Sequence, residues 1–170
     1  MRLVSLIAVL SAVSAVILPT HIVTASVETR EGGWMPIVQQ DHWAIMTIIG
    51  EAASEPFAGQ VAVARVIRNR MQWRYSSDGT VIGTVLRAKQ FSMWDDKARL
   101  YAANIELDSE EYSVAAAAWY ESSLVLDDPW ADAVLYHTKS VFPSWRDAAT
   151  VKKVATVGAH IFYTDQGGGI

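Results

Sequence analysis

Two segments near the middle of the chain carry the strongest hydrophobic pattern. From Asp41 to Ala52 the residues are mostly apolar, and Asp41 is a suitable N-cap. From Pro56 to Met71 apolar residues recur at spacings of three and four, and proline is favoured in the first turn of a helix. The pattern therefore predicts helices over residues 41–52 and 56–71, joined by a short turn.

The rest of the chain carries a weaker pattern. Thr80 is a candidate cap for a short helix, and Asp108-Ser109-Glu110-Glu111 is typical of a capping box, with Asp108 as the cap of a helix that reaches about Leu126. Two β-prone runs follow, at residues 133–138 and 158–163, with a loop between them. We expect these runs to pair as a small β ribbon beside the helices. The predicted fold class is therefore α+β and mainly helical.

Two carboxylates lie at the turn between the first two helices. Glu51 closes a helix that is otherwise apolar, so we expect it beside the core. Desolvation favours the protonated form of a carboxyl group, which is the form that a general acid needs. Glu51 is the candidate catalytic acid, and a surface ion pair with Arg65 or Arg68 is the alternative. Glu55 is either a supporting carboxylate of the site or a favourable charge at the start of the second helix.

The run from Gly50 to Arg70 resembles the signature of the SleB/CwlJ-type cell wall hydrolases, a family of peptidoglycan-cleaving enzymes. Further stretches match this family in the same order: Gln90-Phe91-Ser92 with Trp94, residues 133–136, and residues 157–163. The resemblance covers roughly residues 41–165. It implies a lysozyme-like or lytic-transglycosylase-like catalytic domain in which Glu51 is the catalytic acid.

Sugar-binding clefts combine aromatic rings with amide and hydroxyl groups, because sugars present apolar faces and a rim of hydroxyls. The segment 89–96 has this mixture, and the resemblance favours the cleft over the core as its location. The candidate substrate-binding residues are Gln90, Phe91, Ser92, Trp94, Tyr136, Trp145 and His160. Core packing is the alternative for Tyr136, and a structural role is the alternative for His160.

The N-terminal residues have the features of an export segment. Arg2 precedes an apolar run from Leu3 to Leu18, and Val23-Thr24-Ala25 offers a cleavage site before Ser26. The run is short for a membrane span of about 20 residues. Residues 1–25 are therefore interpreted as a cleaved export signal, or as an uncleaved anchor that contacts the inner membrane transiently. A buried helix of the fold is the alternative.

Length and composition favour one catalytic domain. The chain has 170 residues, of which 51% are hydrophobic, enough for one packed core. Residues 26–40 lack an apolar period and are expected to form a linker or extended arm. We expect the catalytic domain to span residues 41–165 and a flexible tail to span residues 166–170.

Charge and cysteine content narrow the chemistry further. The formal net charge is −4 and there is no basic run, so we expect no nucleic-acid partner. The chain has no cysteine, which excludes disulfides and zinc–thiolate sites. Its histidines show no spacing typical of a zinc site, so we expect neither a metal nor another cofactor.

The resemblance implies an enzyme that cleaves peptidoglycan glycan strands between N-acetylmuramic acid and N-acetylglucosamine. Together with the N-terminal export features, it predicts an exported enzyme of the periplasm or cell wall, which we expect to be a monomer. If Glu51 takes the proton of the muramoyl 6-hydroxyl, the enzyme is a lytic transglycosylase; if water is activated, it is a muramidase. A phage endolysin that lyses its host and a small wall-remodelling enzyme both fit this size. The alternatives are a non-catalytic wall-binding protein and a peptidoglycan amidase.

Overall fold

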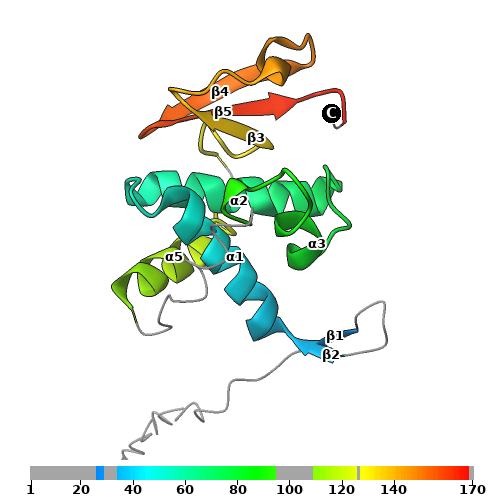
Figure 1. Cartoon of the computed structure of the whole chain (residues 1–170), viewed down its shortest axis with the longest axis vertical. Helices are drawn as coiled ribbons and strands as arrows, with labels where there is room; N and C mark the ends of the chain where they lie inside the picture. The colour runs from blue at the N-terminus through cyan, green and yellow to red at the C-terminus, as the bar shows by residue number, and fades with distance from the viewer. Residues whose placement is uncertain (1–25, 29–33, 95–108, 126, 169–170) are drawn as a thin grey trace, which may run out of the picture.

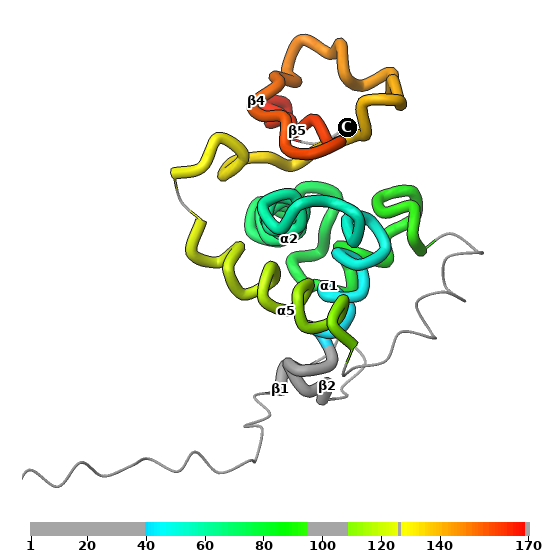
Figure 2. Tube along the Cα trace, turned by 90° about the vertical axis from the view of Figure 1, so that its left-hand side faces the viewer, coloured from blue at the N-terminus to red at the C-terminus, as the bar shows by residue number. Residues whose placement is uncertain are grey.

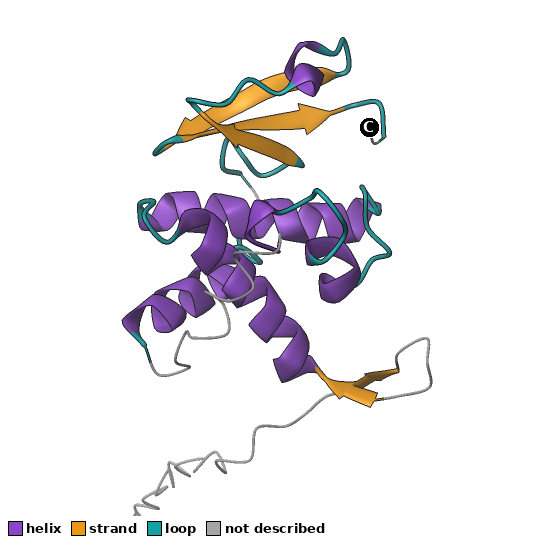
Figure 3. Ribbon diagram, in the orientation of Figure 1, coloured by secondary structure: helices purple, strands orange, loops and turns teal. Residues whose placement is uncertain are grey.

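The computed structural model describes residues 26–28, 34–94, 109–125 and 127–168, with side chains from residue 40 onward (Figure 1). The helices are α1 (Ile37–Ala52), α2 (Phe57–Trp73), α3 (Val81–Val85), η1 (Ser92–Trp94), α5 (Glu110–Glu121) and η2 (Ser144–Asp147), of which η1 and η2 are 3-10 helices. The strands are β1 (Ser26–Glu28), β2 (Trp34–Pro36), β3 (Leu135–Thr138), β4 (Val151–Val157) and β5 (His160–Asp165). Figure 3 shows that α1, α2, α3 and α5 lie together and that β3, β4 and β5 form a separate layer.

Helix α1 is covered by protein along its second half. Residues 44–49 are at most 4% exposed, because a helix that is apolar on every side needs neighbours on every side. These neighbours are α2, α3 and α5. The helix begins at Ile37, so the predicted N-cap at Asp41 is wrong. The Asp41 carboxylate instead accepts a hydrogen bond from Trp119 Nε1 of α5 at 2.9 Å.

The segment 26–40, predicted as a linker, contains secondary structure. Strands β1 and β2 pair antiparallel, with Val27 opposite Met35, and the chain passes directly from β2 into the first turn of α1. Pro36 ends β2 immediately before the helix, where a missing N–H costs little. Helix α5 is capped by Ser109, whose side chain accepts the Tyr112 N–H; the predicted cap, Asp108, lies outside the described residues.

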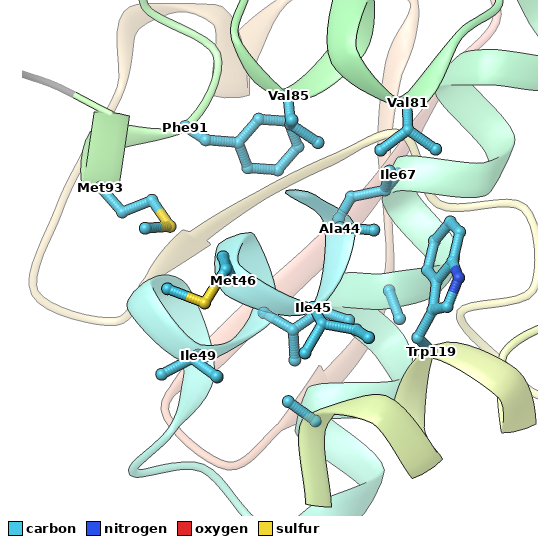
Figure 4. Close-up of a cluster of buried hydrophobic side chains, with 13 residues drawn as sticks. Ala44, Ile45, Met46, Ile49, Ile67, Val81, Val85, Phe91, Met93 and Trp119 are labelled. Atoms are coloured by element: carbon cyan, nitrogen blue, oxygen red, sulfur yellow. The ribbon is translucent and has the colours of Figure 1, made fainter. Parts of the chain in front are cut away.

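The main core lies among α1, α3, η1 and α5. Figure 4 shows Val85 and Phe91 facing Met46 and Ile45 of α1, with Trp119 of α5 at the far side. Each fully buried side chain of this size contributes about 1.5–3 kcal/mol through removal from water. This cluster therefore fixes the end of α1, which carries Glu51, against η1.

Helix α2 separates the helical layer from the sheet. In Figures 1 and 2 the sheet lies on one side of α2, and α1 and α5 lie on the other. Ile67 packs into the core shared with α1, whereas Val63 and Val66 pack against Phe162 of β5. The apolar residues of α2 therefore form two stripes, one packed against the other helices and one packed against the sheet.

Polar side chains at the end of α2 hold the chain that leads into β3. The Asn69 amide, which is fully buried, donates to the carbonyls of Ala131 and Ala133 at 2.7 and 2.8 Å. Arg70 Nε donates to the Val134 carbonyl at 2.7 Å. Buried carbonyl groups are costly without a donor. These hydrogen bonds therefore set the position of β3 over α2, including the position of Tyr136 in that strand.

The sheet has the order β3-β5-β4, with antiparallel neighbours. The predicted pairing of the two β runs is confirmed, since β3 pairs with β5 and places Tyr136 opposite Phe162. The prediction that a loop alone joins them is wrong, because that segment contains η2 and strand β4. In β4 two adjacent lysines and a register shift between Lys153 and Ala155 interrupt the alternation of apolar and polar residues. The pattern of a strand is therefore weak there.

The described residues form a mainly helical α+β fold with a small antiparallel sheet, which confirms the predicted fold class. Among them, none of the helices combines the length and apolar character needed to span a membrane. The predicted export segment, residues 1–25, lies outside the described residues. In the predicted tail, the Gln166 N–H donates to the Thr150 carbonyl at 3.0 Å, and residues 169–170 lie outside the described part.

Candidate active site

Glu51 lies in the last turn of α1, beside η1. The residue before it is Gly50, and a Cβ atom at that position would lie 2.6 Å from Met93 Cβ. Only glycine therefore lets η1 approach the end of α1 this closely. The approach brings the Met93 N–H to Glu51 Oε1, at 2.9 Å. The small residue and the carboxylate beside it thus form one local arrangement.

Three donors hold the Glu51 carboxyl group. Oε1 accepts hydrogen bonds from Ser92 Oγ at 3.1 Å and from the Met93 N–H at 2.9 Å, and Oε2 accepts one from the Tyr136 hydroxyl at 3.0 Å. A carboxylate oxygen offers about two acceptor positions. Oε1 is therefore fully engaged, whereas Oε2 keeps one position at which a proton can be carried.

The Tyr136 hydroxyl keeps its proton, and so remains a hydrogen-bond donor to Glu51, over the physiological pH range. Burial raises the pKa of Tyr136 well above its ordinary value, and the negative charge of Glu51 raises it further. The ring packs edge-on against His160 with centroids 5.1 Å apart and lies 5.7 Å from the Phe162 ring. The orientation of its hydroxyl group is therefore fixed by packing as well as by the hydrogen bond.

Two hollows meet at Glu51. One, the sheet-side hollow, has a volume of about 440 Å³ and lies between Glu51, the residues before η1, strand β3 and the β3–β4 connection. The other, the helix-end hollow, has a volume of about 450 Å³ and is lined by the end of α1, the following turn and η1. Glu51 and Ser92 line both hollows. An extended chain that runs from one hollow to the other would therefore pass Glu51.

Most of the predicted substrate-binding residues line the sheet-side hollow: Gln90, Ser92, Tyr136, Trp145 and His160. The prediction is wrong for Phe91, which is 2% exposed and fills the main core. Trp94 lines neither hollow; it packs on Trp43 and donates from Nε1 to Thr47 Oγ1 at 3.0 Å. In this segment Phe91 and Met93 are buried, whereas Ser92 between them is exposed and lines both hollows.

Glu55 lines neither hollow. Its Oε2 accepts the Ala159 N–H at 2.8 Å in the turn between β4 and β5, and a side chain on Gly158 would collide with the same oxygen. Gly158 has a φ of 55°, which glycine adopts without strain. Of the two roles considered for Glu55, neither describes this contact. The structure gives Glu55 the task of holding the β4–β5 turn against the start of α2.

His160 lies between Glu55 and Tyr136. Its Nδ1 atom is buried, has no hydrogen-bond partner, and is 3.8 Å from Glu55 Oε1. Burial lowers the pKa of His160, although Glu55 and Glu51 both act in the opposite direction. His160 is therefore neutral at pH 7, and its contact with Glu55 at that pH is not an ion pair.

Sequence reasoning missed Arg70, His137 and Lys89, which also line the sheet-side hollow. Arg70 falls seven residues after Val63 and three after Ile67, on the buried stripe of α2, and an arginine in such a stripe is a usable signal. The alternative of an ion pair between Glu51 and Arg65 or Arg68 is wrong. Both arginines instead donate to the end of α5, where Arg65 Nη1 reaches the Ser122 carbonyl and Arg68 Nη2 the Trp119 carbonyl.

Among the described residues, no three side chains of the histidine, aspartate or glutamate type are grouped closely enough to hold a metal ion.

Comparison with known proteins shows the family to which this chain belongs. The sequence profile described as Cell Wall Hydrolase matches residues 54–163. The chain belongs to this family. Membership confirms the resemblance drawn from the sequence and makes the protein a cell-wall-degrading enzyme. The matched range begins after Glu51, so the profile itself does not assign that residue a role. A search of curated proteins gives no match.

Two solved structures resemble this one. The first is the catalytic domain of the germination-specific lytic transglycosylase SleB from Bacillus anthracis, with 28% identity and a TM-score of 0.55, covering 73% of this chain and 93% of that chain. The second is the catalytic domain of the Bacillus cereus SleB protein, with the same identity and TM-score, covering 73% of this chain and 89% of that chain. The fold is therefore the lysozyme-like α+β fold of these domains, as predicted.

Proposed function

We propose that the protein is a lytic transglycosylase that cleaves peptidoglycan between N-acetylmuramic acid and N-acetylglucosamine, with Glu51 as the single acid and base. One observation carries this proposal: Glu51 is the only carboxylate among the described residues that line the two hollows. A hydrolytic glycosidase of the usual kind needs a second carboxylate close to the scissile bond. A lytic transglycosylase needs no second carboxylate, because the substrate itself supplies the nucleophile.

The reaction starts with Glu51 protonated at Oε2, the oxygen with a free acceptor position. Oε2–H gives its proton to the glycosidic oxygen, the bond from that oxygen to muramoyl C1 breaks, and positive charge develops at C1. The muramoyl 6-hydroxyl oxygen then bonds to C1, and its proton goes to the Glu51 carboxylate. The products are a 1,6-anhydro sugar and a free 4-hydroxyl group, water is not consumed, and Glu51 is protonated again.

The donors around Glu51 support this sequence of steps. Between the two proton transfers the carboxyl group is an anion, and hydrogen bonds to a charged oxygen are about twice as strong as those between neutral groups. Ser92, Met93 and Tyr136 supply three such bonds without moving. Preorganised donors of this kind stabilise a charge that develops during the reaction. The 28% identity to a lytic transglycosylase domain supports the same reaction type.

We also propose that the protein is exported, because its substrate lies outside the cytoplasm. The apolar run from Leu3 to Leu18, followed by Val23-Thr24-Ala25, supports this. Expression in a bacterium should give an exported chain that begins at Ser26, as N-terminal sequencing would show. A chain that keeps Met1 and stays in the membrane would instead support an anchor, and a chain found only in the cytoplasm would contradict export.

The reaction type is tested by digesting purified peptidoglycan in water enriched in ¹⁸O and analysing the fragments by mass spectrometry. We expect muramoyl ends that are anhydro sugars without ¹⁸O. Reducing muramoyl ends that carry ¹⁸O would identify a muramidase and contradict the transglycosylase. New amino groups on the stem peptide would identify an amidase, and no release at all would indicate a protein that binds the wall without cleaving it.

A further inference from the structure

The sheet-side hollow contains a buried cation, and among the described residues no acidic side chain forms a hydrogen bond or an ion pair with it. Arg70 is 4% exposed and lines this hollow. Its Nε donates to the Val134 carbonyl at 2.7 Å and its Nη1 to Gln90 Oε1 at 3.0 Å. Both partners are uncharged, and an arginine side chain remains protonated in proteins even where burial lowers its pKa, as it does here. The guanidinium is thus a fixed positive charge.

A second cation, Lys89, stands in the same hollow. Lys89 is exposed, and its backbone has a φ of 64°, in the left-handed region that residues with a side chain rarely adopt. Glycine or asparagine would adopt this conformation at lower cost. A lysine is therefore an unexpected residue at this position for the fold alone, and residues in such conformations gather at functional sites.

The charges in the hollow do not cancel. Its only described carboxylate, Glu51, is held by Ser92, Met93 and Tyr136 rather than by a cation. Burial lowers the pKa of His160, so this side chain adds no positive charge at pH 7. The hollow therefore carries an excess of positive charge in a protein whose net charge is −4. The helix-end hollow, by contrast, has no charged lining residue besides Glu51 among those described.

We propose that the sheet-side hollow recognises a carboxylate of the substrate through Arg70 and Lys89. This proposal rests on the proposed function. Of the two sugars of the glycan strand, only the muramoyl sugar bears a lactyl group, which ends in a carboxylate or continues into a stem peptide that has carboxylates of its own. The muramoyl sugar therefore binds in the sheet-side hollow, and the uncharged N-acetylglucosamine that leaves binds in the helix-end hollow.

The test compares soluble glycan strands that differ only in charge. The first pair lacks stem peptides: one member has free lactyl carboxylates, and in the other these groups are converted to carboxamides. The second pair keeps its stem peptides: one member has free peptide carboxyl groups, and in the other they are amidated. The variant Lys89→Gln removes one cation and keeps the length of the side chain. Lys152→Gln is the matched control, because Lys152 is an exposed lysine of β4 that lines neither hollow. Glycosidic cleavage and thermal melting are measured for every protein.

We expect wild type to cleave the charged member of a pair with a kcat/KM about tenfold higher than that of its neutral partner. Lys89→Gln should lower this ratio about twofold to fivefold, the range of an exposed ion pair, and Lys152→Gln should leave it unchanged. If charge changes kcat/KM for the pair without stem peptides, the recognised group is the lactyl carboxylate. If charge changes kcat/KM only for the pair that keeps its stem peptides, the recognised group is a carboxylate of the stem. Both results support the proposal.

A different pattern would overturn the proposal and show which part fails. If wild type cleaves charged and neutral strands equally, carboxylate recognition is refuted while the proposed glycosidic cleavage stands. If Lys89→Gln lowers the ratio no more than Lys152→Gln does, Lys89 does not recognise the carboxylate and the proposal fails. If wild type cleaves none of the strands, the proposed function itself fails, and the carboxylate site fails with it.

Discussion

Replacing Tyr136 by phenylalanine removes one hydroxyl group from the site and leaves the rest of the side chain in place. The ring contacts with His160 and Phe162 do not involve the hydroxyl, so β3 should keep its position. The lost interaction is the 3.0 Å hydrogen bond from Tyr136 to Glu51 Oε2. A hydrogen bond to a charged group is worth about 1.5–3 kcal/mol, and about 1.4 kcal/mol corresponds to a factor of ten in rate.

We therefore expect Tyr136→Phe to lower kcat on purified peptidoglycan by about tenfold to a hundredfold, with little change in KM. The release of soluble fragments measures turnover, and chemical denaturation measures stability. Tyr75→Phe is the matched control, because the Tyr75 hydroxyl donates to the Asp165 carboxylate, also at 3.0 Å, and Tyr75 lines neither hollow. If the two variants lose equal activity, or if Tyr136→Phe keeps more than about half of it, the hydroxyl group does not assist Glu51.

Further predictions concern the supports of the site. Glu55→Gln keeps an acceptor for the turn between β4 and β5, so activity should stay within about threefold of wild type, while Glu55→Ala should lower the free energy of unfolding by about 1–3 kcal/mol; a large catalytic loss in Glu55→Gln would give Glu55 a chemical role. Asn69→Ala leaves two buried carbonyls without their donor and should cost about 2–4 kcal/mol, which an unchanged denaturation midpoint would refute. Burial lowers the pKa of His160 in the folded state below its ordinary value of 6.5. The stability that neutral His160 contributes is therefore present above pH 6.5 and is lost as the pH falls through the folded-state pKa. The free energy of unfolding of wild type should fall more steeply below pH 6.5 than that of His160→Gln, and equal slopes would contradict this.

Much of the fold could be predicted because its elements have local signals. The apolar run before Glu51 and the spacing of Val63 and Ile67 are properties of α1 and α2 themselves, and they predicted both helices. Strand β4 could not be found in this way, because Lys152 and Lys153 are adjacent and a bulge follows them. The start of α1 was misplaced for a related reason: the segment after Pro36 has no apolar period.

The site depends on contacts between distant parts of the chain, and these have no local signal. Glu51 and Tyr136 are 85 positions apart in the sequence, and their hydrogen bond exists because the anchors at the end of α2 hold β3 in place. Phe91 and Ser92 are adjacent in the sequence, but Phe91 lies in the core and Ser92 lies at the site. The composition of their segment could not show this difference. Arg70 was missed because an arginine is ordinarily a surface residue.

In the proposed reaction Glu51 is the group that transfers the proton, and the variant Glu51→Gln removes that proton without changing the shape of the side chain. Glutamine keeps the shape of the side chain and its acceptor oxygen but has no proton to give, and general acid–base groups contribute about 10² to 10⁴-fold. The rate of anhydro-muropeptide release, measured by mass spectrometry, should fall to about a hundredth of wild type or less, with the fold intact and Glu55→Gln as the control. If Glu51→Gln keeps more than about a tenth of the wild-type rate, Glu51 is not the catalytic acid.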